Sequence, residues 1–170
     1  MAARIDLEKL RESGRISATA LAHGRKMIVP GVRIEEVQRA VEAKIRELGG
    51  EPAFPAQTSR NHIAAHYCSP PGDPTTAQPG DIIKLDCGTH VDGYVTDNAT
   101  TVDLRDGDNS LLLSASKMAL ENAIAVMGPG VSLTEVGRTV EETITSLGFK
   151  PVRNLCGHGV ARYTIHHRLA

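Results

Sequence analysis

The stretch Lys84 to Thr101, KLDCGTHVDGYVTDNATT, places two carboxylates, Asp86 and Asp97, in a segment that otherwise resembles β-strand. On one continuous strand these residues, eleven apart, would face opposite ways and lie more than ~30 Å apart. The Asp92-Gly93 pair between them is a favoured hairpin turn. This turn makes Asp86 face Ala99 and makes Asp97 its diagonal neighbour on the same face, within ~8 Å. The stretch therefore predicts a β-hairpin on which two carboxylates converge.

Two carboxylates this close need a compensating group, because at roughly 5 Å they repel by ~3 kcal/mol even at an effective dielectric of about 20. A shared proton, the ammonium of Lys84 on the same face, or a metal cation would supply it, and the hairpin alone leaves these alternatives open. His158 shifts the balance towards a metal, since its flanking glycines allow close approach to the imidazole. Two carboxylates and one imidazole suit manganese, iron, cobalt or zinc, although three ligands are too few to hold two ions well.

Simpler roles are expected for the other histidines considered. His66 lies among small apolar neighbours in AAHY, where a satisfied core histidine is the usual explanation. His166 would lie ~27 Å from His158 if the strand between them is straight, so the two are expected to take different roles unless that strand bends. His23 and His90 are expected at the surface.

Composition predicts a soluble globular protein of one domain, with 170 residues, 41% hydrophobic and 23% charged. The net charge of −1 gives no basic footprint for nucleic acid. No apolar run is long enough to cross a membrane and no secretion signal opens the chain, so a cytoplasmic location is expected. The three cysteines form no CxxC pair and are expected to be small buried residues: Cys68, Cys87 and Cys156.

An internal repeat organises the chain. The segment 30–52 aligns without gaps on the segment 129–151, a shift of 99 residues that matches the opening Pro-Gly-Val, the Leu-Gly stop and the closing proline. Apolar periodicity and stop signals predict four helices, at 7–23, 34–48, 110–127 and 133–147, and a proline-rich loop separates the two helix pairs at 69–81.

The repeat predicts one domain over 1–170, with a first repeat at about 6–105 and a second, incomplete repeat at about 108–170. Adding the shift to Asp86 and Asp97 gives positions beyond residue 170, so the second repeat is expected to lack its aspartate hairpin. We therefore expect apolar surface on the second half and, as its consequence, a homodimer, a swapped assembly or marginal stability.

Three segments together resemble a known family: PAFPAQTSRNHIAAHYCSPPGD, IIKLDCGTHVDGYVTDNATTV and NLCGHGVARYTIHH. In this order and spacing they are similar to the motifs of the archaeal branch of the type II methionine aminopeptidases. The resemblance implies an α+β "pita-bread" (creatinase/aminopeptidase) fold with a pseudo-twofold repeat of helix-helix-strand units around a curved antiparallel sheet. It also implies removal of the initiator methionine from nascent proteins, near the ribosome, by two divalent metal ions (Co, Mn, Fe or Zn).

Roles for individual residues follow from the resemblance alone. It implies metal ligation by Asp86, Asp97 and His158, with Asp97 bridging both ions, and catalytic and substrate-binding roles for His66 and His166. Phe54, Pro55 and Gln57 match positions that line the methionine pocket, where Gln57 replaces the usual asparagine. The family has two further glutamate ligands downstream, so we expect weak metal binding and little turnover from residues 1–170 alone.

Two other functions remain open at this point. The first is a non-catalytic protein that binds a partner, as some relatives of this fold do. Against a long-standing loss of catalysis, the chain retains five polar site residues: Asp86, Asp97, His158, His66 and His166. Enzymes of the same fold also act on X-Pro peptides or creatine, which the AAHY context disfavours.

Overall fold

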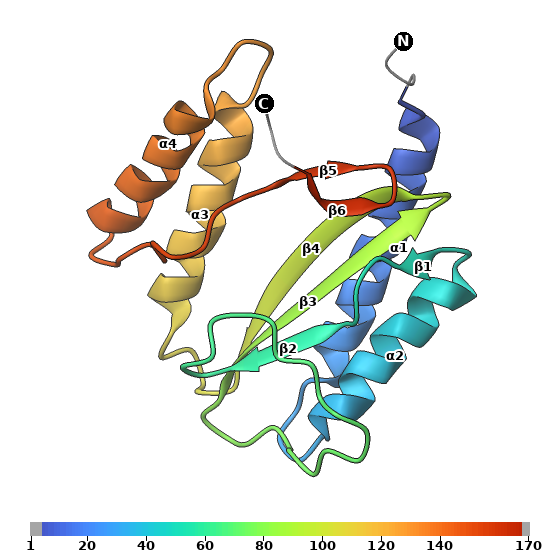
Figure 1. Cartoon of the computed structure of the whole chain (residues 1–170). Coiled ribbons are helices and arrows are strands. Elements are labelled where there is room, and N and C mark those ends of the chain that lie inside the picture. The colour runs from blue at the N-terminus through green and yellow to red at the C-terminus, as the bar shows by residue number, and fades with distance from the viewer. Residues whose placement is uncertain (1–4, 168–170) are drawn as a thin grey trace. The chain divides into compact units, whose positions relative to one another are not determined.

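The computed structural model describes residues 5–167 and has an α+β architecture, as predicted (Figure 1). Within that range it contains four helices and six strands. In chain order these are α1 (Leu7–Met27), α2 (Ile34–Glu47), β1 (Glu51–Pro52), β2 (Gln57–Arg60), β3 (Ile82–Val91), β4 (Tyr94–Asp103), α3 (Ser110–Val126), α4 (Leu133–Ser146), β5 (Gly159–Ala161) and β6 (Thr164–His167).

The hairpin predicted from the Asp92-Gly93 turn is confirmed. Strands β3 and β4 pair antiparallel, with Asp86 opposite Ala99 and Asp97 opposite Gly88. Both turn residues adopt left-handed backbone angles, with φ of +49° at Asp92 and +82° at Gly93, as a two-residue turn of this kind requires. The other edge of β3 pairs antiparallel first with β2 and then with β1, so β3 is the central strand of the sheet.

Helices α1 and α2 pack together against this sheet, and α1 contacts both β3 and β4. The largest fully buried side chains come from α1, α2 and β3 and form one core: Ile16, Ile34, Val37, Val41, Ile45, Ile83 and Leu85. Gly24 permits the close approach, because a Cβ there would collide with Val41 and lie 2.8 Å from Leu85 Cδ2. The apolar positions of α2 that follow helical periodicity are therefore the ones buried in this core.

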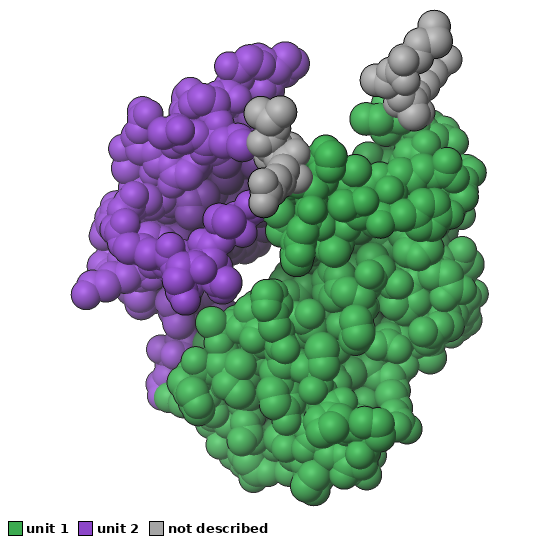
Figure 2. Space-filling model, in the orientation of Figure 1, with its two compact units in different colours: residues 1–106, 158–170 green, residues 107–157 purple. Residues whose placement is uncertain are grey.

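The chain divides into two compact units (Figure 2). Unit 1 comprises the described residues up to Asp106 together with those from His158 onwards, and unit 2 comprises Gly107–Gly157. Unit 2 contains α3 and α4, which pack on each other, and Asn122 Nδ2 donates to Thr143 Oγ1 at 3.0 Å. The organisation into one domain of two repeats stays a prediction.

Unit 2 buries little apolar surface. Helix α3 buries only Ala115, Ala119 and Ala123, and none of the residues of α4 is buried. Several large apolar side chains of this unit are exposed, among them Leu111, Leu120, Ile124, Met127, Leu133, Val152 and Leu155. The expected apolar surface on the second half is confirmed.

The predicted helices are all present, with small changes at their ends. Helix α1 runs to Met27 rather than His23, and α4 begins and ends 99 residues after α2, the same shift that aligns the two sequence segments. The proline-rich loop contains no helix, and its Thr76 forms only an isolated bridge with Arg33. None of the helices in the described range has the length and apolar character needed to cross a membrane.

The prediction that all three cysteines are buried is wrong for two of them. Cys87 is buried beneath α1, with its Sγ 4.0 Å from Ser17 Oγ, and burial raises the pKa of this thiol to about 11. Cys68 and Cys156 are exposed, because both lie in segments without regular structure at the surface.

Candidate metal centre

Asp86 lies in the middle of β3 and is the most buried acidic group of the candidate centre, with 17% of its side chain exposed. Its Oδ1 is buried and has no hydrogen-bond partner among residues 5–167. Burial raises the pKa of Asp86 to about 6, and the negative charge of Asp97 adds to this increase, whereas Lys84 and His66 oppose it. The carboxylate is therefore desolvated, close to a like charge and incompletely compensated.

Lys84 is the alternative partner considered above. Its Nζ lies 3.9 Å from Asp86 Oδ2, at the outer limit of an ion pair, and 31% of its side chain is exposed. The pKa of Asp86 remains raised despite this contact. Lys84 thus relieves part of the repulsion, and room remains for a second positive group.

His158 lies against the second carboxylate, with its Nε2 3.4 Å from Asp97 Oδ2. The other ring nitrogen, Nδ1, is 3.2 Å from the carbonyl oxygen of Gly159. About a third of each side chain is exposed, 30% for His158 and 32% for Asp97, so both can be reached from solvent. The structure thus places an imidazole beside the carboxylate with which sequence reasoning grouped it.

His166 lies much closer to His158 than a straight strand would allow, because the chain between them bends. The two ring centroids are 4.6 Å apart in an edge-to-face arrangement. The chain reverses direction at Arg162 and Tyr163, so that β5 and β6 form an antiparallel hairpin with Gly159 opposite His167. Sequence reasoning missed this turn because it contains neither glycine nor asparagine, and Tyr163 adopts a left-handed φ of +57° that few non-glycine residues take.

The apolar neighbours of His66 suggested a core histidine, and that expectation is wrong. His66 is exposed, has a left-handed φ of +66°, and its charge acts on Asp86. The segment after it is held by Gln38 of α2, a residue only 6% exposed. Gln38 Nε2 donates to the carbonyl oxygen of Tyr67 at 3.2 Å, and its Oε1 accepts from the amide of Ser69 at 3.0 Å.

Gln38 was not singled out from the sequence, although a signal was present. It lies four residues after Ile34 and three before Val41, on the apolar stripe of its helix. A polar side chain on a buried stripe needs partners, and here the loop that carries His66 provides them.

The residues matched to a methionine pocket lie beside β3. Gln57 is opposite Asp86 in the β2–β3 register, and its Oε1 is buried with no hydrogen-bond partner within the described part of the chain. Phe54 is half-buried, with its ring over Gly88, where an added Cβ would collide with it. Pro55 is exposed. Gly88 was missed, although a glycine inside a strand often marks a close approach.

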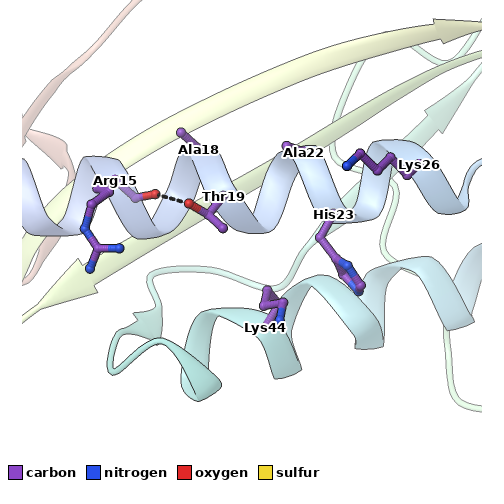
Figure 3. A pocket seen from close by; sticks show the side chains of 7 residues that line it. All are labelled: Arg15, Ala18, Thr19, Ala22, His23, Lys26 and Lys44. Carbon is purple, nitrogen blue, oxygen red and sulfur yellow. Dashed lines mark hydrogen bonds between the residues drawn. The ribbon is translucent and has the colours of Figure 1, made fainter.

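A separate groove lies between α1 and α2, lined by Arg15, Ala18, Thr19, Ala22, His23, Lys26 and Lys44 (Figure 3). None of these residues belongs to the predicted centre, and their side chains include no carboxylate or thiol. His23 is at the surface, as expected, but His90 is partly buried and its Nδ1 accepts from the amide of Gly93 at 3.3 Å. The expectation of an ordinary surface residue is therefore wrong for His90.

The ligand types in the candidate centre fit a divalent cation. Carboxylates and imidazole are suitable donors, and a cation would satisfy the buried Asp86 oxygen, which accepts no hydrogen bond from the described residues. Across residues 5–167, however, no three histidine, cysteine or acidic side chains are arranged closely enough to hold a metal as they stand. The three predicted ligands form two adjacent pairs, Asp86 with Asp97 and Asp97 with His158.

Comparison with known proteins identifies related chains. Residues 8–169 match the family described as Metallopeptidase family M24. A methionine aminopeptidase of Archaeoglobus fulgidus is 49% identical over 94% of this chain and 54% of its own length, and one of Pyrococcus horikoshii is 44% identical over 95% and 55%. The crystal structure of methionine aminopeptidase from Thermotoga maritima superimposes with a TM-score of 0.89 at 30% identity, covering 98% of this chain and 71% of that one.

These matches confirm the family resemblance and the pita-bread fold expected from the sequence motifs. The chain spans about half the length of the curated relatives cited above.

Proposed function

The chain belongs to metallopeptidase family M24, and from this premise we propose that Asp86, Asp97 and His158 bind divalent metal for the hydrolytic removal of an N-terminal methionine. One observation carries the proposal. Within residues 5–167, a buried carboxylate oxygen of Asp86 has no hydrogen-bond partner while a second carboxylate lies beside it, and the neighbouring Lys84 compensates only in part. A cation at this position would satisfy the oxygen and offset the repulsion between the carboxylates.

The residues around the centre support an acyl-transfer role. When bound, a divalent cation would polarise the scissile carbonyl as a Lewis acid and lower the pKa of a water molecule, so that the water loses a proton and hydroxide is available to attack near neutral pH. His166, whose ring contacts that of His158, would donate a hydrogen bond to the substrate carbonyl and to the negative charge that develops on its oxygen. His66, whose charge acts on Asp86, would contact the scissile peptide and its leaving amine.

Phe54, Pro55 and Gln57 would form part of a pocket for the methionine side chain. The exposed and half-buried apolar surfaces of Pro55 and Phe54 provide contacts for a thioether, and Gln57 lies next to the metal-binding strand. Gly88 supports this arrangement, because only a residue without Cβ leaves space for the Phe54 ring.

Metal titration of the purified chain tests this proposal. Isothermal titration with Co²⁺ or Mn²⁺ is expected to detect weak binding that is lost in Asp97→Asn and His158→Ala. Asp106→Asn removes an exposed carboxylate outside the candidate centre and should leave the binding unchanged. Binding that survives in both site variants, or no binding by the unaltered chain, would contradict the assignment of ligands.

Turnover is a separate measurement. Three protein ligands are too few to hold two metal ions well, so we expect residues 1–170 tested by themselves to release little or no methionine from a short Met-Ala peptide. Rapid release of methionine by this chain would show that expectation to be wrong.

The family also suggests a cellular location, a class of substrate and a state of assembly for this chain. We expect a cytoplasmic location, nascent proteins as substrates near the ribosome, no direct binding of nucleic acid, and Co, Mn, Fe or Zn as the metal. The exposed apolar residues of unit 2 favour association, either as a homodimer or, as a second candidate function, as a module that binds another protein. Light scattering that shows a monomer across a wide concentration range would argue against the homodimer.

A further inference from the structure

The β5–β6 hairpin positions two of the three candidate histidines, His158 and His166, but is not part of the main sheet. It forms a separate two-stranded sheet, with His158 immediately before β5 and His166 within β6. A two-stranded hairpin is only marginally stable without further contacts. The position of the histidines relative to Asp97 therefore depends on how this hairpin is attached to the rest of unit 1.

The attachment lies at the two turns. Asp92, in the β3–β4 turn, accepts hydrogen bonds through Oδ1 from Arg162 Nη2 at 2.8 Å and from the Tyr163 hydroxyl at 3.1 Å. Arg162 Nε also donates to the backbone carbonyl of Asp92 at 2.9 Å. The second carboxylate oxygen of Asp92 accepts from Lys9 Nζ of α1 at 2.6 Å.

The backbones of the two turns also fit together. The amide of Tyr163 donates to the carbonyl oxygen of Gly93 at 2.8 Å. A Cβ on Gly93 would lie 2.5 Å from the Tyr163 ring, so the absence of a side chain at Gly93 permits this approach. The Tyr163 ring is 5.7 Å from that of His90, and the Arg162 guanidinium lies 5.6 Å from the centre of the Tyr94 ring.

We propose that Asp92, Arg162 and Tyr163 form a turn-to-turn latch that holds the β5–β6 hairpin in place and so positions His158 beside Asp97 and His166 against His158. These three are positioning residues, because they act on the candidate centre through the hairpin and touch none of its ligands. The significance of the latch for metal binding rests on the function proposed above, whereas its effect on the hairpin does not.

An exposed ion pair alone would be a weak basis for this proposal, since such pairs contribute only ~0–1 kcal/mol. The side chains here are partly exposed, 41% for Asp92 and 52% for Arg162. The latch differs from an isolated pair because one carboxylate is shared by three donors and a backbone hydrogen bond accompanies them. Its effect should therefore appear as local order of the hairpin rather than as global stability.

Hydrogen exchange of the full 170-residue chain tests the latch directly. Asp92→Asn keeps a residue that tolerates the left-handed turn conformation but removes the charge. We expect amides of residues 159–167 to exchange about tenfold faster in Asp92→Asn and in Arg162→Met, with little further increase in the double variant. Glu12→Gln, which removes an exposed carboxylate from α1, is the control and should leave exchange in the hairpin unchanged.

Two further measurements separate a latch from a general loss of stability. The urea midpoint of the sheet and of α1–α2 should differ little between Asp92→Asn and Glu12→Gln. Arg162→Lys keeps the charge but not the forked pair of donors, so it should restore protection only partly. Hairpin exchange in Asp92→Asn that equals exchange in Glu12→Gln would overturn the latch.

Metal binding provides the functional arm of the test. The Co²⁺ dissociation constant is expected to rise about tenfold in Asp92→Asn, a loss of ~1.4 kcal/mol, and not in Glu12→Gln. If the unaltered chain binds no Co²⁺ while the exchange result holds, the proposed function fails and the latch stands. If Co²⁺ affinity is unchanged although the hairpin has loosened, the latch does not position the histidines for the metal, and that part of the inference is wrong.

Discussion

Helices α2 and α4 have nearly the same sequence pattern and the same length, yet their surroundings differ. Helix α2 buries Ile34, Val37, Val41 and Ile45 against α1 and the sheet, whereas α4 buries none of its residues. Both begin after a turn with a left-handed glycine, Gly31 or Gly130. The comparison shows that the pattern is sufficient to specify the helix, whereas burial of the apolar stripe depends on the sheet that packs against it.

The two helices also start differently. The N-cap of α2 is Arg33, which makes no side-chain cap, but the amide of Ile34 donates to the carbonyl oxygen of Thr75 at 3.0 Å and Arg33 Nη2 donates to that of Asp73 at 2.7 Å. The N-cap of α4 is Ser132, whose hydroxyl accepts from the amide of Glu135 at 3.2 Å. A tertiary loop thus fixes the start of α2, and a local cap fixes that of α4.

The largest effect is expected from removing a core side chain. Ile45→Ala should lower the free energy of unfolding of unit 1 by ~2–5 kcal/mol, because it leaves a cavity among fully buried neighbours. The corresponding change 99 residues later, Ile144→Ala, removes a half-buried side chain and should cost less than half as much. Urea denaturation combined with segment-resolved hydrogen exchange measures both, and equal losses would contradict the contrast between the helices.

Asp86→Asn is expected to stabilise the metal-free protein. The folded state binds a proton on Asp86 more tightly than the unfolded state, since its pKa rises from 3.8 to about 6. The unfolding free energy of the unaltered chain should therefore increase as pH falls from 7 towards 4. At pH 8, Asp86→Asn should be more stable by up to roughly 3 kcal/mol, and the difference should vanish near pH 4.

Chemical denaturation at several pH values measures this difference. A pH-independent loss of stability in Asp86→Asn would show that the negative charge of Asp86 does not destabilise the metal-free folded state. Because unit 2 contains none of the predicted ligands, exchange in α3 and α4 should not respond to the substitution.

Gly24→Ala sharpens the same comparison by testing the contact with the sheet. The new methyl group would collide with Val41 and approach Leu85, so overpacking of ~1–3 kcal/mol should exceed the ~1 kcal/mol of helix propensity gained and leave a net loss of up to ~2 kcal/mol. The position 99 residues later is Ala123, where the corresponding helix already carries a methyl group. Thermal unfolding of Gly24→Ala with an unchanged or raised midpoint would be inconsistent with this packing.

The smallest effect concerns the start of α4. Ser132→Ala should lower helix stability by about 1 kcal/mol through loss of the N-cap hydrogen bond, and the effect should be visible because so little burial supports α4. Faster amide exchange in the first turn of α4 is the expected result. Ser132→Asp provides the comparison, since it restores an acceptor and should retain the slower exchange of the unaltered helix.

Local signals account for much that the sequence predicts correctly. Apolar periodicity identifies all four helices, glycine stops mark the ends of three of them, and the Asp92-Gly93 pair specifies the register that brings Asp86 and Asp97 together. These features are determined by residues that are close together in the sequence, so they can be identified without knowing the tertiary structure.

Features that depend on distant partners could not be predicted in this way. The β5–β6 turn has no turn-forming residue of its own and is fixed by contacts with Asp92 and Gly93, about 70 residues earlier. His66 likewise has an exposed, left-handed conformation, and the residue after it, Tyr67, is hydrogen-bonded to Gln38 of α2. In both cases the determining interaction joins residues that no local pattern links.

The distribution of cysteines makes the protein suitable for site-specific labelling. Cys68 lies in unit 1 and Cys156 in unit 2, and both are exposed, whereas Cys87 is buried and its pKa of about 11 keeps it protonated. A maleimide spin label or fluorophore should therefore attach once to each unit without any substitution, more slowly at Cys68, where partial burial raises the pKa of the thiol. The native chain thus carries a ready pair of probe positions from which an inter-unit distance can be measured, with and without added metal.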